Sequence, residues 1–212
     1  MDNKKWFNNW KTELFEHKFY ILGALILLTI TVIINYLTGY YVDSFNSPGV
    51  QDLFLSLIPP MNLSILFVEG YMLGLGLLIF YPFFFETKKV AYVIYHFSIL
   101  VIIRSAFLCV THLGAPIDAV AVKFPEAIMN IYFQNDLFFS GHVACLFLGF
   151  LIFKGKIRYA FLTLAVLMGF TVLAMHIHYS IDVFAAPFIA YGTYKMGNWL
   201  LKKLKRNSYV GS

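Results

Sequence analysis

Long apolar runs constrain this chain more than any other feature of its sequence. A bilayer core about 30 Å thick needs roughly 20 apolar residues of helix to cross it. Hydrophobic residues make up 60% of the 212 residues and charged residues only 13%, whereas about a quarter of the residues of a soluble domain are charged. Runs near the required length lie at 19–42, 66–85, 90–113, 137–153, 159–175 and 179–196. We therefore expect an all-α, polytopic integral membrane protein with six transmembrane helices.

The membrane domain, 19–196, is expected to lie between an N-terminal segment, 1–18, and a basic tail, 197–212. In the first segment the aromatic residues include Trp6 and Trp10, at helical spacing. This pattern predicts an amphipathic helix at the membrane interface or a simpler aromatic anchor. The first apolar run is too long for the core of a cleavable signal peptide, so we interpret it as a retained span.

The lysines and arginines predict the orientation of the chain in the membrane. In a six-span arrangement, fourteen of them lie on one side and only Lys123 lies on the other. Cytoplasmic loops carry an excess of these residues. We therefore expect both termini in the cytoplasm, with the loops at 43–65 and 114–136 on the non-cytoplasmic side.

Several classes of partner and cofactor are not indicated. The formal net charge of +5 comes from basic residues in short loops and near the termini, and no basic aromatic stripe points to nucleic acid. Cys109 and Cys145 lie inside apolar runs and resemble small buried hydrophobic residues. No Cys/His spacing predicts a metal site. We expect no metal, no cofactor and no nucleic acid, and the sequence does not indicate an oligomeric state.

Ionisable side chains inside the predicted spans are the candidates for function, because burying them in a bilayer is costly. The group consists of Glu69, His96, Arg104, His112, His142, His176, His178 and Asp182. In the six-span topology all of them except His96 lie towards the non-cytoplasmic leaflet. His96 is interpreted as structural.

His178 and Asp182 stand four residues apart, a spacing that places two side chains on one face of a helix. A carboxylate can hold one ring nitrogen of a histidine, fix the tautomer and leave the other nitrogen as a nucleophile or base. The alternative interpretation is a satisfied polar pair that packs two helices together.

Ser140, Gly141 and His142 stand where a loop enters the fourth predicted span. The N-terminus of a helix offers free backbone N–H groups and a positive dipole end, which suit a phosphate. Glycine allows close approach of the backbone, and the serine hydroxyl can bind a ligand or merely cap the helix. Arg104 adds a guanidinium whose geometry matches phosphate, although a salt bridge to Glu69 or Asp182 is the alternative.

Two stretches carry a family resemblance, DLFFSGH at 136–142 and HIHYSIDV at 176–183. Together they resemble the paired histidine motifs of the type 2 phosphatidic acid phosphatase superfamily, most closely those of its sphingomyelin-synthase-like branch. In that branch the motifs run D-x-x-x-S-G-H and H-x-H-Y-[S/T]-x-D-V, and every fixed letter is present. Weaker matches are the arginine-led stretch that begins at Arg104 and LIPP at 57–60. The resemblance implies a six-helix bundle.

The chain departs from the wider superfamily in its basic residues. The Lys-x6-Arg-Pro motif is missing, and Thr171 and Val172 stand where Ser-Arg would precede the second histidine. The synthase-like branch also lacks both features. This leaves Arg104 as the one clear cationic residue of the expected phosphate site.

The resemblance implies a lipid headgroup phosphotransferase or a lipid phosphatase that needs no metal and works through a phosphohistidine. His178 would attack phosphorus, Asp182 would orient it, and His142 would serve as general acid and then as base. Side chains and backbone that would hold the phosphoryl oxygens are Arg104, Ser140 and Gly141. Weaker candidates for headgroup binding or for tuning His178 are Glu69, Asp136 and His176.

Membrane lipids are thus the expected substrates. Aromatic surroundings and a single arginine favour transfer from a phosphodiester lipid to a lipid alcohol of the ceramide or diacylglycerol type. The alternative enzyme is a lipid phosphate phosphatase that hydrolyses phosphomonoesters. A transporter or channel would need polar residues through the whole membrane depth, whereas here they gather on one side.

Overall fold

The computed structural model describes residues 3–45, 47–122 and 137–210. Regular structure in those ranges is helical, as the sequence predicts. The helices are α1 Asn3–Glu16, α2 Lys18–Asp43, α3 Leu53–Leu57, α4 Ser64–Phe85, the 3-10 turn η1 Thr87–Lys89, α5 Val90–Val110, α7 Gly141–Ile152, α8 Lys156–Ala174 and α9 Ser180–Val210.

Four helices are long and apolar enough to cross a membrane, namely α2, α4, α5 together with η1, and α8. They coincide with four of the predicted spans and indicate an integral membrane protein. The predicted span at 137–153 corresponds to α7, which has 12 residues and would extend about 18 Å. The predicted span at 179–196 is only the first part of α9, which continues to Val210. The six-span count and the orientation of the termini stay predictions.

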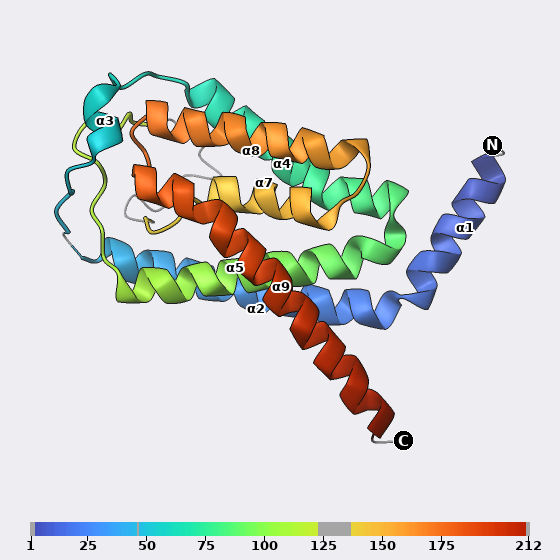
Figure 1. Cartoon of the computed structure of the whole chain (residues 1–212). Coiled ribbons are helices and arrows are strands. Elements are labelled where there is room, and N and C mark those ends of the chain that lie inside the picture. Colours follow the sequence, from blue (N-terminus) through green and yellow to red (C-terminus); the bar gives the residue numbers. More distant parts are fainter. Residues whose placement is uncertain (1–2, 46, 123–136, 211–212) are drawn as a thin grey trace.

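Short α7 occupies the centre of the bundle. Figure 1 shows α4 and α8 on one side of it and α2 and α5 on the other, with α9 beginning beside one end of it and then crossing over α5. The buried residues that α7 gives to the core include Val143, Ala144, Leu146 and Leu148. A helix that is apolar all round is covered on all sides, and α7 is covered by its neighbouring helices.

The two termini lie at the same end of the bundle (Figure 1). The first helix, the last part of α9, η1 and the turn between α7 and α8 gather there, and we call it the terminus end. The opposite end, here called the loop end, carries α3 and the segments 47–63, 111–122 and 175–179. Both histidine motifs of the sequence analysis reach the loop end, because α7 and α9 begin there.

Tyr179 joins the three segments of the loop end. Its hydroxyl donates to the Gly114 carbonyl oxygen at 2.7 Å and accepts from the Val50 N–H at 3.0 Å. The Gly114 N–H in turn donates to the Pro48 carbonyl oxygen at 3.3 Å. A Cβ on Gly114 would overlap the carbonyl oxygen of Ser47, so only glycine permits this crossing of the two segments.

The first helix lies against the turn between α4 and α5 at the terminus end. Trp10 donates its Nε1–H to the Phe83 carbonyl oxygen at 2.7 Å. Glu13 accepts from the Thr87 hydroxyl and pairs with Lys88 at 3.7 Å. The expected N-terminal helix therefore forms, while its place at a membrane interface stays a prediction.

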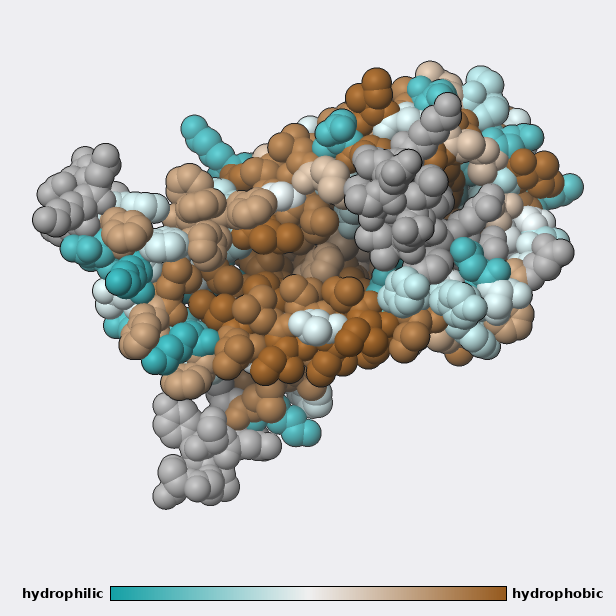
Figure 2. Space-filling view, turned by 180° about the vertical axis from the view of Figure 1, so that it is seen from behind, coloured by the Kyte–Doolittle hydropathy of each residue, from teal (hydrophilic) through white to brown (hydrophobic). Residues whose placement is uncertain are grey.

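Hydrophobic side chains cover most of the middle of the face seen in Figure 2. A monomeric soluble protein rarely exposes a contiguous apolar patch of more than a few hundred Å².

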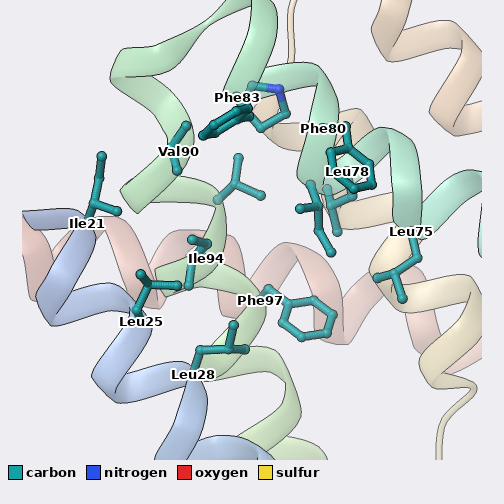
Figure 3. A pocket seen from close by; sticks show the side chains of 13 residues that line it. Ile21, Leu25, Leu28, Leu75, Leu78, Phe80, Phe83, Val90, Ile94 and Phe97 are labelled. Atoms are coloured by element: carbon teal, nitrogen blue, oxygen red, sulfur yellow. The ribbon is translucent and has the colours of Figure 1, made fainter. Parts of the chain in front are cut away.

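A hollow of about 290 Å³ lies between α2, α4 and α5 near the terminus end (Figure 3). Its lining is apolar throughout and includes Ile21, Leu25, Phe83 and Phe97. This hollow suits a hydrocarbon chain and offers no group for acid–base chemistry.

The orientation can be tested with single cysteines at the two ends. In a background of Cys109→Ala and Cys145→Ala, we expect Ile117→Cys at the loop end to react with an impermeant thiol reagent outside intact cells. Ile117 is 84% exposed, so its accessibility depends on sidedness alone. The matched variant Lys154→Cys, at the terminus end, should react only after permeabilisation. If only Lys154→Cys reacted in intact cells, the orientation would be the opposite of the predicted one.

Candidate active site

His178 and Asp182 form the predicted pair. The Nδ1–H of His178 donates to Asp182 Oδ2 at 3.2 Å, and both side chains are almost completely buried. Asp182 lies in the first turn of α9, whereas His178 precedes that helix by two residues. The Tyr179 N–H also donates to Asp182 Oδ2, at 3.1 Å. Because a carboxylate only accepts, Nδ1 carries the proton of this bond, and in the neutral ring Nε2 is then the nitrogen without a proton.

The start of α7 meets the start of α9 at this pair. Ser140 is the N-cap of α7, and its hydroxyl accepts from the Val143 N–H at 3.4 Å. The Ser140 N–H donates to the Asp182 carbonyl oxygen at 3.0 Å. These contacts bring His142, in the first turn of α7, opposite His178, with ring centroids 5.9 Å apart and planes inclined by 66°. The two histidines are close enough for one bound group to reach both.

Arg104 approaches the same helix start from α5. Its side chain is buried, and Nε–H donates to the Phe139 carbonyl oxygen at 3.3 Å. A Cβ on Gly141 would lie only 3.0 Å from Arg104 Nε. Glycine at 141 therefore lets the guanidinium lie against the first turn of α7. This places a fixed positive charge beside the positive end of the helix dipole.

Two aromatic side chains of α4 complete the wall around His142. The ring centroids of Phe67 and Tyr71 lie 4.7 Å and 4.4 Å from that of His142. Their spacing of four residues places them on one face of α4. Nothing in the sequence singles them out, because an aromatic pair on an apolar helix is usually just core packing.

Two polar atoms of the site have no hydrogen-bond partner among the described residues. They are His142 Nδ1 and Asp182 Oδ1, both buried. A buried polar atom left unpaired costs about 1–3 kcal/mol, and such atoms in native structures call for an explanation such as a bound ligand or water.

Glu69 and His112 are not brought to the histidines. Glu69 stands between Phe67 and Tyr71 in sequence, so it projects from another face of α4, and its side chain is exposed. His112 lies beyond the end of α5, stacked on Phe45 with centroids 4.0 Å apart. His96 is buried about two turns along α5 from Arg104, with Nδ1 2.8 Å from the Tyr92 carbonyl oxygen.

His176 connects two segments of the loop end. It has φ of 53° and follows α8, where its N–H donates to the Leu173 carbonyl oxygen and the Ile177 N–H donates to that of Val172. This is a helix C-terminal motif that usually carries glycine in the left-handed position. The Nε2 of His176 lies 2.9 Å from the Ile58 carbonyl oxygen. His176 thus holds the LIPP segment at 57–60. Asp136, the remaining candidate, lies outside the described residues.

Asp52 is a residue near the site that the sequence analysis missed. Its Oδ2 accepts from the Ser180 N–H at 2.7 Å, at the first residue of α9. Aspartate directly before an apolar run is an N-cap signal for α3, but no local pattern predicts a contact 128 residues away.

Among the described residues, no group of three or more His, Cys, Asp or Glu side chains is arranged to hold a metal ion. No family model matches the chain, and comparison with curated proteins finds no match. The assignment of a function therefore depends on the geometry of the site and on the motifs.

The pairing at Asp182 gives a stability prediction. Asp182→Ala would leave two buried donors, His178 Nδ1–H and the Tyr179 N–H, without their acceptor. Each unpaired donor costs about 1–3 kcal/mol, so we expect a clearly lower melting temperature in detergent. Asp118→Ala removes an exposed carboxylate and should leave the melting temperature nearly unchanged. Equal melting temperatures for the two variants would contradict the pairing.

Proposed function

We propose that this protein is a membrane-embedded lipid phosphotransferase of the sphingomyelin-synthase-like type. It moves a phospho-headgroup from a phospholipid to a lipid alcohol of the ceramide or diacylglycerol type. The observation that carries the proposal is the arrangement of His178, held at Nδ1 by Asp182, with the ring of His142 5.9 Å away.

In the first half-reaction, Nε2 of His178 attacks phosphorus and forms an N–P bond. The P–O bond to the leaving alcohol breaks, and His142 donates its proton to that oxygen. Asp182 stabilises the positive charge that develops on the His178 ring. In the second half-reaction, the acceptor alcohol attacks phosphorus, His142 takes its proton, and the N–P bond breaks.

The start of α7 supplies the electrostatics of this proposal. Arg104 and the helix dipole provide positive charge at the point where the phosphoryl oxygens would lie. Arg158 and Arg206, the other two arginines of the chain, belong to the helices near the terminus end. A phosphodiester carries one negative charge, which one arginine can match, whereas a phosphomonoester dianion would require more.

The six-span topology and its orientation are part of the proposal. With both termini in the cytoplasm, the loop end and the site face the non-cytoplasmic side. The charge bias of the sequence supports this orientation, and the position of the site at the end opposite both termini is consistent with it. A transporter or channel is less well supported, because the hollow between α2, α4 and α5 is apolar.

The test is a partitioning experiment in liposomes. Purified protein receives a phosphatidylcholine donor labelled in its phosphate, with and without ceramide or a diacylglycerol whose acyl chains differ from those of the donor, and phosphatidic acid in a parallel sample. We expect a labelled lipid product that depends on the acceptor, and little released headgroup. His178→Ala should abolish transfer, while His112→Ala, which removes a histidine outside the site, should not.

Two results would contradict this proposal in different ways. Phosphate release from phosphatidic acid without any headgroup transfer would assign the site to a lipid phosphate phosphatase. Undiminished transfer by His178→Ala would exclude the phosphohistidine mechanism altogether.

Arg104 gives a separate prediction. Arg104→Lys keeps the charge but loses the planar, forked donor geometry and the Nε–H bond to Phe139. We expect the rate of transfer to fall about 10²- to 10³-fold, as when one donor to a developing charge is removed. The matched variant is Arg158→Lys, since Arg158 stacks on Phe150 away from the site. Similar transfer rates for the two variants would show that Arg104 acts only through its charge.

A further inference from the structure

Asp52 connects the N-terminal ends of two helices with one carboxylate. Its Oδ1 accepts from the N–H groups of Phe54 and Leu55 at 2.9 Å and 3.2 Å, and so caps α3. Its Oδ2 accepts from the Ser180 N–H at 2.7 Å, the shortest of these bonds. Both oxygens are therefore occupied, and the two helix starts are held at a fixed separation.

The ionised form of Asp52 is the form that these contacts favour. Burial alone would raise the pKa of this carboxyl, but hydrogen bonds from Ser180, Leu55 and Phe54 lower it. Two positive helix ends facing one anion act in the same direction. Asp52 is therefore a charged anchor at neutral pH and not a neutral hydrogen-bond partner.

Ser180 lies between the two residues of the predicted catalytic pair. His178 precedes it by two residues and Asp182 follows it by two, and both are fixed by local contacts at the start of α9. The hydrogen bond from the Ser180 N–H to Asp52 therefore restrains the turn that sets the distance between His178 and Asp182. No other side chain among the described residues is recorded as accepting from the Ser180 N–H.

We infer that Asp52 is a positioning residue for the reaction. Through its bond to Ser180, it fastens the segment 47–63 to the start of α9 and holds His178 in line with its substrate. The inference rests on the proposed function for its kinetic consequence, although the anchoring itself is a property of the fold.

The test compares Asp52→Asn with Asp118→Asn. Asparagine keeps the shape and one acceptor oxygen, but it cannot accept from both helix ends. The control removes the same charge from the same side of the molecule, because Asp118 and Asp52 line one hollow at the loop end. Two measurements are made on purified full-length protein: steady-state transfer from labelled phosphatidylcholine to ceramide, and hydrogen–deuterium exchange of the backbone around 178–183.

For Asp52→Asn we expect kcat to fall about 10- to 100-fold, because a misplaced reacting group lowers the rate on this scale. KM should be nearly unchanged. Amide exchange at 178–183 should rise, and exchange within α4 and α8 should not. Asp118→Asn should stay within about twofold of the wild type, as exposed substitutions usually do.

Each other outcome is informative. Equal exchange and equal kcat in the two variants would overturn the inference. A rise in exchange across the whole bundle would show that Asp52 only stabilises the fold. Absence of any transfer by the wild type would refute the proposed function, and the exchange measurement would still decide whether Asp52 anchors α9.

Discussion

The buried carboxylate of Asp182 is the interaction on which the site depends. A buried carboxylate is costly unless donors reach it, and one oxygen of Asp182 has two of them at the start of its own helix. His178 and the backbone of Tyr179 supply hydrogen bonds to Oδ2, and the helix N-terminus supplies a positive potential. Its carbonyl oxygen also receives the N–H of Ser140. One residue therefore orients the nucleophile candidate and joins α9 to the start of α7.

The loop end keeps this arrangement in place through contacts between distant segments. The Tyr179 hydroxyl both donates and accepts a hydrogen bond, and its two backbone partners belong to different segments. His176 holds the LIPP segment through Ile58, and the N–H of Met61 donates to the carbonyl oxygen of Ala174 at the end of α8. These bonds satisfy backbone groups that would otherwise be left unpaired next to an apolar bundle. Their cumulative effect is a covered site built from parts of the chain that the sequence separates widely.

Much of the bundle can be predicted from the sequence, because long apolar runs leave the chain few alternatives. Four of the predicted spans are helices of membrane-spanning length within a few residues, and the spacing of His178 and Asp182 predicts their contact. The central position of α7 was not predictable, since apolar content does not show which helix is surrounded by the others. Nor were the roles of Asp52 and of His176 at the end of α8, which depend on partners more than a hundred residues away. Glu69, in contrast, was a candidate because of its residue type, but it lies on a face of α4 that does not meet the histidines.

The length of α7 also explains where the chemistry would take place. α7 and α8 meet at the turn around Gly155, but α7 has 12 residues and α8 has 19. At about 1.5 Å per residue, the start of α7 falls roughly 10 Å short of the level reached by α8. The positive end of α7 therefore lies inside the bundle, beside Arg104 and below the loops, where water screens its dipole less than at the surface. A phosphoryl group drawn to that point would leave bulk water before it met His178. On the proposed mechanism, this recess favours a lipid alcohol over water as the group that attacks the phosphohistidine.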